Sequence, residues 1–239
     1  MLHPFRIAIV CAALAVAACS SSESAAARES TPHPTSDAPA RAPAQASTRP
    51  RIVFLGDSLT AGYGLELEQS VPSLVQKHLD ADGFKYQVIN AGVSGDTSAG
   101  GLRRLEWSLD GDVRILVVEL GANDGLRGLP VADMKRNLKT IVQTARKRGI
   151  DVLLTGMEAP PNYGRDYIVS FHKVFPALAK QYHVDLVPFL LDGVAGSEAL
   201  NQADGIHPTA AGARVVADNV WRVLKPVAEA AKGEGRSGS

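Results

Sequence analysis

Five short apolar runs, separated by segments with helical spacing, constrain the fold of this chain more than any other feature. Each run is rich in β-branched residues and is continuously apolar instead of alternating, which is typical of parallel strands covered on both faces. The runs are Ile52–Leu55, Tyr86–Ile89, Ile115–Leu120, Val152–Thr155 and Val184–Val187. Because strand and helix alternate five times, we expect an α/β domain of three layers. It would be a doubly wound, flavodoxin-like, five-stranded parallel sheet with helices on both faces.

Apolar residues at helical spacing mark the segments between the runs. Three stripes consist of Leu74, Val75, His78 and Leu79; of Met134, Leu138, Ile141, Val142 and Ala145; and of Phe171, Val174, Phe175, Leu178 and Ala179. A last helix is predicted to begin at Thr209, with Pro208 suited to its first position.

The first nineteen residues have the features of a bacterial lipoprotein signal peptide. The apolar stretch from Ile7 to Ala18 is too short for a bilayer span of ~20 residues, and it suits the apolar region of a secretory signal. It ends at Cys19 in a sequence that resembles a lipobox, in which the cysteine is lipidated. The alternative is an ordinary signal in which Cys19 has no role. With Ser20 following, lipidation predicts an exported protein anchored in the cell envelope, on the periplasmic side of the outer membrane of a Gram-negative host.

Composition sets the remaining domain boundaries. Residues 20–50 are mostly Ser, Ala, Thr, Pro and Arg, and such a segment buries too little apolar surface to offset its ordering entropy, so we expect a disordered tether. The folded domain is predicted over residues 51–232, a usual size for one domain, with a flexible tail at 233–239.

Charge and cysteine content narrow the choice of partners. Lys and Arg together number 25, as do Asp and Glu, and no basic stripe recommends a nucleic-acid partner. The two cysteines are Cys11 and Cys19, so the predicted domain has no disulfide and no thiolate metal site. We expect a monomer that needs neither metal nor organic cofactor.

Polar, glycine-rich segments follow the predicted strands. Gly56-Asp57-Ser58 follows the first run, the segment 90–96 follows the second, and Gly121-Ala122-Asn123-Asp124 follows the third. The segment Asp204–His207 comes after the fifth by a longer loop. Sites in open parallel sheets form beyond the carboxyl ends of the strands, so these segments are predicted to meet at one edge.

Three residues in these segments have the chemistry of a serine nucleophile with its base and acid. A carboxylate at Asp204 can reach the near ring nitrogen of His207 in a tight turn, and the far nitrogen is then free to face Ser58. Two structural alternatives stay open. Asp57 and Ser58 are also common helix caps, and the turn before Pro208 needs no catalytic role.

Two further residues are candidates for stabilising an oxyanion. Gly95 lacks a side chain, so its N–H can approach a substrate, and Asn123 offers an amide NH₂ at the end of the third strand. The alternatives are a tight turn at Gly95 and an Asx-turn at Asn123.

The blocks Gly56-Asp57-Ser58-Leu59, Gly95, Gly121-Ala122-Asn123-Asp124 and Asp204-x-x-His207 resemble the SGNH (GDSL) hydrolase family. The likeness extends from Arg51 to Lys225 and is greatest to the bacterial thioesterase I, lysophospholipase and arylesterase branch. It implies Ser58 as nucleophile, His207 as base and Asp204 as orienting acid. It also implies an oxyanion hole made by the backbone N–H groups of Ser58 and Gly95 and the side chain of Asn123.

The resemblance implies a carboxylic ester hydrolase that works through a covalent acyl-enzyme. Its substrate would be a small acyl ester, such as an aryl ester, a lysophospholipid or an acyl thioester. Leu126, Met157 and Tyr163 are candidates for an acyl groove, although Leu and Met there could equally serve packing. Two alternatives are a carbohydrate O-deacetylase of the same fold and a catalytically idle lipid-binding lipoprotein.

Overall fold

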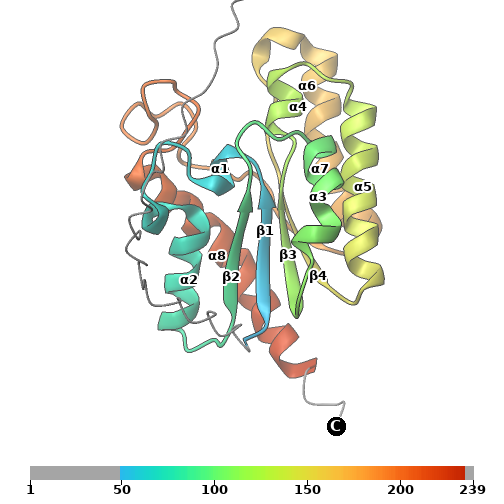
Figure 1. Cartoon of the computed structure of the whole chain (residues 1–239). Coiled ribbons are helices and arrows are strands. Elements are labelled where there is room, and N and C mark those ends of the chain that lie inside the picture. Colours follow the sequence, from blue (N-terminus) through green and yellow to red (C-terminus); the bar gives the residue numbers. More distant parts are fainter. Residues whose placement is uncertain (1–48, 235–239) are drawn as a thin grey trace, which may run out of the picture. The chain divides into compact units, whose positions relative to one another are not determined.

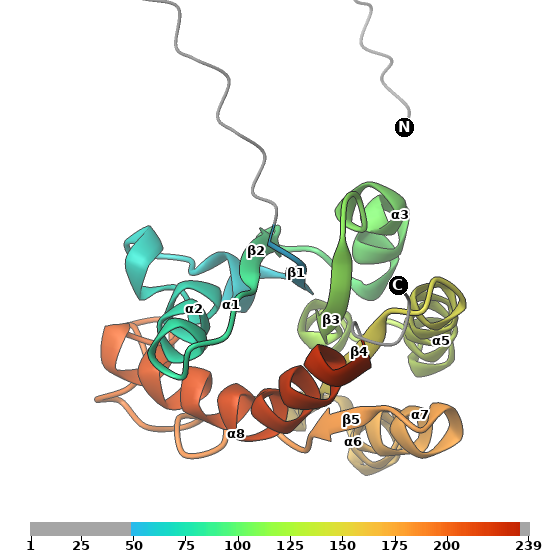
Figure 2. The same ribbon diagram turned by 90° about the horizontal axis from the view of Figure 1, so that it is seen from below.

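A computed structural model of the chain describes residues 49–234. The predicted signal peptide, the lipidation at Cys19, all but the end of the tether and the last residues of the tail lie outside the described residues. Within 49–234, five parallel strands form one sheet in the order β2-β1-β3-β4-β5; Figure 1 labels the first four strands and Figure 2 also labels β5. Their bounds are β1 Arg51–Gly56, β2 Gln87–Gly92, β3 Val113–Glu119, β4 Asp151–Thr155 and β5 Asp185–Val187. This is the flavodoxin-like order, which confirms the predicted fold class.

Helices cover both faces of the sheet. They are α1 Ser58–Ala61, α2 Val71–Ala81, α3 Ser98–Ser108, α4 Ala122–Leu126, α5 Val131–Lys147, α6 Arg165–His172, α7 Val174–Tyr182 and α8 Ala210–Glu234, with 3₁₀ turns η1 Leu67–Gln69 and η2 Pro161–Tyr163. Figure 2 shows α2 and α8 on one face and α3 and α5 on the other. No helix in the described part of the chain is both long and apolar enough to cross a bilayer.

The central strands carry the core. Ile52, Leu55, Ile115, Leu116 and Val117 are all fully buried, because side chains on either face of the sheet are covered by a helical layer. Burying each such side chain contributes about 1.5–3 kcal/mol. The continuous apolar runs are therefore explained by burial on both faces.

The residues of the third apolar stripe, Phe171 to Ala179, lie on two helices and not on a single continuous one. Helix α6 ends at His172 and α7 begins at Val174. Pro176 has no N–H to donate to the carbonyl of His172, and its ring collides with that carbonyl in a continuous helix. The proline instead lies in the first turn of α7, where N–H groups lack helical partners.

Two further differences have local causes. Helix α8 begins at Ala210 because Thr209 is its cap, with Oγ1 accepting the N–H of Gly212 at 3.3 Å. Pro208 therefore precedes the cap, and the prediction that it occupies the first helical position was wrong. Helix α3 was not predicted, because its Gly100-Gly101 pair is typical of a loop. A Cβ on Gly101 would lie 2.2 Å from Leu120 Cδ1, so the glycine allows the helix to pack closely on the sheet.

Candidate active site

Ser58, Asp204 and His207 come together at the carboxyl edge of the sheet. Ser58 is the first residue of α1, and the other two lie on the loop between β5 and α8. His207 Nε2 is 2.9 Å from Ser58 Oγ, and His207 Nδ1 is 2.7 Å from Asp204 Oδ2. A hydroxyl, an imidazole and a carboxylate thus form one hydrogen-bonded line, with the geometry for passing the serine proton to the imidazole.

The turn around Asp204 fixes both the carboxylate and the imidazole. Asp204 Oδ1 accepts the backbone N–H groups of His207 at 3.0 Å and of Ile206 at 2.9 Å. The bond from the His207 N–H, followed by the bonds from the imidazole and from the Ile206 N–H, holds the pKa of Asp204 well below its usual range. Gly205 supplies the left-handed conformation of the turn, at φ +69°. One turn therefore positions both the Asp204 carboxylate and the His207 imidazole.

Helix α1 is capped by Asp57, which leaves the Ser58 hydroxyl to His207. Asp57 Oδ1 accepts the N–H of Leu59 at 3.0 Å. Close packing beneath this turn requires a glycine before it, because a Cβ on Gly56 would lie 2.0 Å from Thr60 Oγ1. The cap alternative thus holds for Asp57 and not for Ser58.

Gly95 and Asn123 line the same cavity as Ser58 and His207, with a volume of about 200 Å³. Gly95 has φ +82°, and its carbonyl accepts from Arg127 Nη2 at 2.7 Å. Asn123 lies in the first turn of α4, and its Nδ2 donates to Asp57 Oδ2 at 2.9 Å. Figure 1 shows α1 and α4 at the same edge of the sheet. Backbone and amide donors therefore border the space in front of the serine.

Two carboxyl groups are buried beneath this cavity. Asp57 is 0% and Glu119 is 3% exposed. Glu119 Oε2 accepts the N–H of Asp57 at 3.1 Å and the hydroxyl of Thr60 at 2.9 Å. Burial raises the pKa of Asp57, and burial together with the charge of Asp57 raises the pKa of Glu119 well above its usual value.

An apolar cavity of about 340 Å³ adjoins the cavity at Ser58. It shares four lining residues with the cavity at Ser58, which are Leu59, Ala122, Leu126 and Ile206. Leu126 and Met157, two of the candidates for an acyl groove, line this cavity. Phe189 and Leu191 also line this cavity and were not predicted, although both lie on the segment that follows the fifth strand at the carboxyl edge of the sheet.

Tyr163 lies outside the lining of both cavities. Its hydroxyl donates to the carbonyl of Leu126 at 2.8 Å, and its ring packs against Tyr167. Tyr163 therefore supports the segment that carries Leu126. A residue not predicted, Tyr63, is closer to the chemistry, because its ring centroid is 4.6 Å from that of His207.

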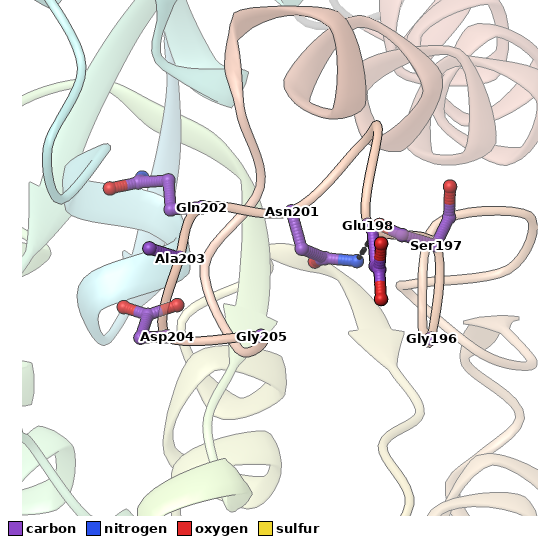
Figure 3. A pocket seen from close by; sticks show the side chains of 8 residues that line it. All are labelled: Gly196, Ser197, Glu198, Asn201, Gln202, Ala203, Asp204 and Gly205. Atoms are coloured by element: carbon purple, nitrogen blue, oxygen red, sulfur yellow. Dashed lines mark hydrogen bonds between the residues drawn. The ribbon is translucent and has the colours of Figure 1, made fainter.

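A larger polar pocket, of about 530 Å³, lies within the loop that carries Asp204. Figure 3 shows the side chains that line it, from residues 196–198 and 201–205. Asn201 is buried there, and its Nδ2 donates to the carbonyls of Val194 and Ser197 at 2.7 and 2.8 Å. The pocket shares Gly196, Asn201 and Gly205 with the apolar cavity, so the apolar cavity has common walls with both its neighbours.

Known proteins resemble this chain in sequence and in fold. Residues 54–215 match the model of the GDSL-like Lipase/Acylhydrolase family. Esterase TesA of Pseudomonas aeruginosa strain PAO1 is 47% identical over 177 residues, covering 74% of this chain and 88% of that protein. Thioesterase 1/protease 1/lysophospholipase L1 of Escherichia coli K12 is 36% identical over 184 residues, covering 77% and 87%. A crystal structure of TesA has a TM-score of 0.71 and covers 74% of this chain and 98% of its own.

The chain belongs to the GDSL-like lipase/acylhydrolase family. It is a carboxylic acyl-ester hydrolase of the SGNH type, as its sequence predicted.

Proposed function

We propose that the chain hydrolyses esters through a covalent acyl-enzyme on Ser58. The observation that carries this proposal is the hydrogen-bonded line from Asp204 through His207 to Ser58. His207 Nε2 takes the hydroxyl proton while Ser58 Oγ bonds to the ester carbonyl carbon. The tetrahedral intermediate then breaks its bond to the alcohol oxygen, and His207 returns the proton to the leaving alcohol.

Water completes the cycle by the same route. It gives a proton to His207 as its oxygen attacks the acyl carbon, and the proton then passes to Ser58 Oγ when the acyl bond breaks. Asp204 stabilises the imidazolium that forms in both halves, without itself taking the proton. Its low pKa, held by two backbone N–H groups and the imidazole, keeps it ionised at neutral pH.

The negative charge on the carbonyl oxygen requires donors in both halves. We assign these to the backbone N–H groups of Ser58 and Gly95 and to the amide of Asn123, which border one cavity. Each such donor is worth a factor of roughly 10²–10³ in rate.

The apolar cavity favours a fatty acyl ester as substrate. Its lining includes Leu126, Met157, Phe189, Leu191 and Ile206, so a hydrocarbon chain bound there loses contact with water. Relatives with the names esterase, arylesterase and lysophospholipase agree with this class. An acetyl group has no methylene chain to place in this cavity, so the sugar O-deacetylase is the second choice.

We further propose that the enzyme is exported and tethered to the cell envelope. The features that support this are the leader sequence of residues 1–19, with its lipobox-like cysteine, and the polar composition of residues 20–50. The domain at 51–232 would then act on acyl esters outside the cytoplasm, where acyl-CoA is not a natural substrate.

Covalent labelling tests the central claim. A fluorophosphonate probe should label the wild type, and Ser58→Ala should lose the label while keeping its circular dichroism spectrum. A panel of p-nitrophenyl esters, lysophospholipid and acetylated sugar then compares substrate classes. Equal labelling of both proteins would refute Ser58 as the nucleophile, whereas no labelling and no turnover of any ester would favour the idle lipid-binding alternative.

A further inference from the structure

Asp57 and Glu119, the buried carboxyl pair, have no part in the proton transfer from Ser58. Both are almost completely inaccessible to water. Burying carboxyl groups is costly unless hydrogen bonds compensate them. Capping of α1 explains the burial of Asp57 but not the burial of Glu119.

The two carboxylate oxygens of Asp57 bind different partners, one in helix α1 and one at the proposed oxyanion site. Oδ1 accepts the N–H of Leu59 at 3.0 Å, and Oδ2 accepts from Asn123 Nδ2 at 2.9 Å. An ionised carboxylate accepts but does not donate, whereas an amide has an acceptor oxygen and two N–H donors. The carboxylate therefore holds the amide by its NH₂ end, and the second N–H stays available on the cavity that Asn123 shares with Ser58.

Glu119 contacts the backbone of Asp57, whereas Asn123 contacts its side chain. Glu119 Oε2, at the end of β3, accepts the backbone N–H of Asp57 and the hydroxyl of Thr60. The absence of a Cβ at Gly56 permits this approach, because that atom would lie 2.7 Å from Glu119 Oε2. The three elements β1, α1 and β3 are thus joined at Asp57.

We propose that Asp57 is a positioning residue for the oxyanion site, whose carboxylate fixes the Asn123 amide with one N–H toward the substrate, and that Glu119 fixes Asp57. The inference rests on the proposed acyl-enzyme mechanism. It predicts that a loss at Asp57 acts on the transition state through Asn123 and leaves ground-state binding of the ester almost unchanged.

Asp57→Asn tests the link to Asn123. The new amide has one acceptor oxygen, so either the Leu59 N–H or the Asn123 amide then faces a donor. We expect kcat on a p-nitrophenyl ester to fall by about 10- to 100-fold, with KM within a few-fold. The double variant Asp57→Asn/Asn123→Ala should be no slower than Asn123→Ala alone, because both changes remove the same interaction.

A second cap provides the matched control. Ser70 is buried like Asp57 and caps α2 by accepting the N–H of Ser73. Ser70→Ala should lower the melting temperature and leave kcat unchanged. If Asp57 were only a cap, Asp57→Asn would likewise leave kcat unchanged, because asparagine caps helices as well as aspartate does.

Glu119 gives an independent pair of variants. Glu119→Gln keeps a carbonyl oxygen for the two donors and should keep kcat within a few-fold. Glu119→Met has similar bulk without the acceptor and should lower kcat by about 10-fold. This pair decides the matter if Asp57→Asn does not fold.

Three results would overturn the inference: wild-type kcat in folded Asp57→Asn, losses at Asp57 and Asn123 that simply multiply, or equal kcat in the two folded Glu119 variants. A wild-type enzyme without ester turnover or fluorophosphonate labelling would instead refute the proposed function. The two failures are therefore distinguishable.

Discussion

Replacing Glu119 by glutamine should change how the stability of the protein depends on pH. Glu119 is buried, and its pKa is raised well above its usual value by burial and by the charge of Asp57. The folded state therefore keeps the proton of Glu119 at pH values where the unfolded chain, with a glutamate pKa of about 4.3, has released it.

The direction follows from this difference in bound protons. Below about pH 4 both states hold the proton, and the stability contribution of the neutral acid is fully present. As the pH rises from there to the native pKa of Glu119, folding requires uptake of a proton, and the free energy of unfolding falls. The contribution is therefore lost toward alkaline pH.

The pH dependence of the free energy of unfolding follows from the single proton that the folded state holds and the unfolded state has released. Inside this window the free energy of unfolding of the wild type should fall by about 1.4 kcal/mol per pH unit from Glu119. For a domain of this size that corresponds to about 3–5 °C in melting temperature per pH unit. In Glu119→Gln this fall is absent, because the amide has no proton to release.

Urea unfolding between pH 4.5 and 8 measures the difference between the two proteins directly. The curves of wild type and Glu119→Gln should diverge as the pH rises, with the variant more stable at neutral pH. Glu68→Gln, which removes an exposed carboxylate from η1, is the control for the change in formal charge. Parallel pH profiles for wild type and Glu119→Gln would refute a proton on buried Glu119.

The remaining predictions concern catalysis and location. Ser58→Ala and His207→Ala should each abolish nearly all turnover without unfolding the protein, and the double variant should be scarcely worse in kcat; strictly multiplying losses would contradict a shared role. Asn123→Ala should lower kcat by ~10²–10³ with KM within a few-fold, and an unchanged kcat would leave that residue no part in the oxyanion site. Met157→Ala should shift the preference toward longer acyl chains in a series of p-nitrophenyl esters, because it enlarges the apolar cavity. Cys19→Ser should move the protein from the membrane to the soluble fraction, whereas a soluble wild type that incorporates no labelled fatty acid would refute the anchor.

The sheet and the meeting of Ser58 with His207 were accessible from the sequence for one reason. Five apolar runs fix the order of layers, and the carboxyl ends of parallel strands lie at one edge. Polar residues placed just after those runs must then lie near one another. The contact between Asp204 and His207 was also predictable, because a spacing of three residues places both groups in one turn.

The buried carboxyl pair was not accessible in the same way. Glu119 lies within the apolar run of β3, and its sequence position does not reveal that its side chain meets the backbone of Asp57, 62 residues earlier. The position of Tyr163 could not be predicted for a related reason. An aromatic residue near a cavity can pack behind the lining residues as easily as it can line the cavity, and the sequence does not distinguish the two. The break between α6 and α7, which Pro176 imposes, shows that local chemistry can override apolar periodicity. The glycine-rich α3 shows the reverse, because close packing on Leu120 outweighs the loop preference of Gly100-Gly101.

The contact between Ser58 and His207 joins residues 149 positions apart. Contacts between residues so far apart in sequence cost loop-closure entropy, and folding that depends on such contacts is slower than the formation of local structure. Ester turnover during refolding therefore reports long-range closure, whereas helical circular dichroism also reports local structure. A delay between the recovery of the two signals would measure the time between forming the layers and joining the two ends of the sequence into one enzyme.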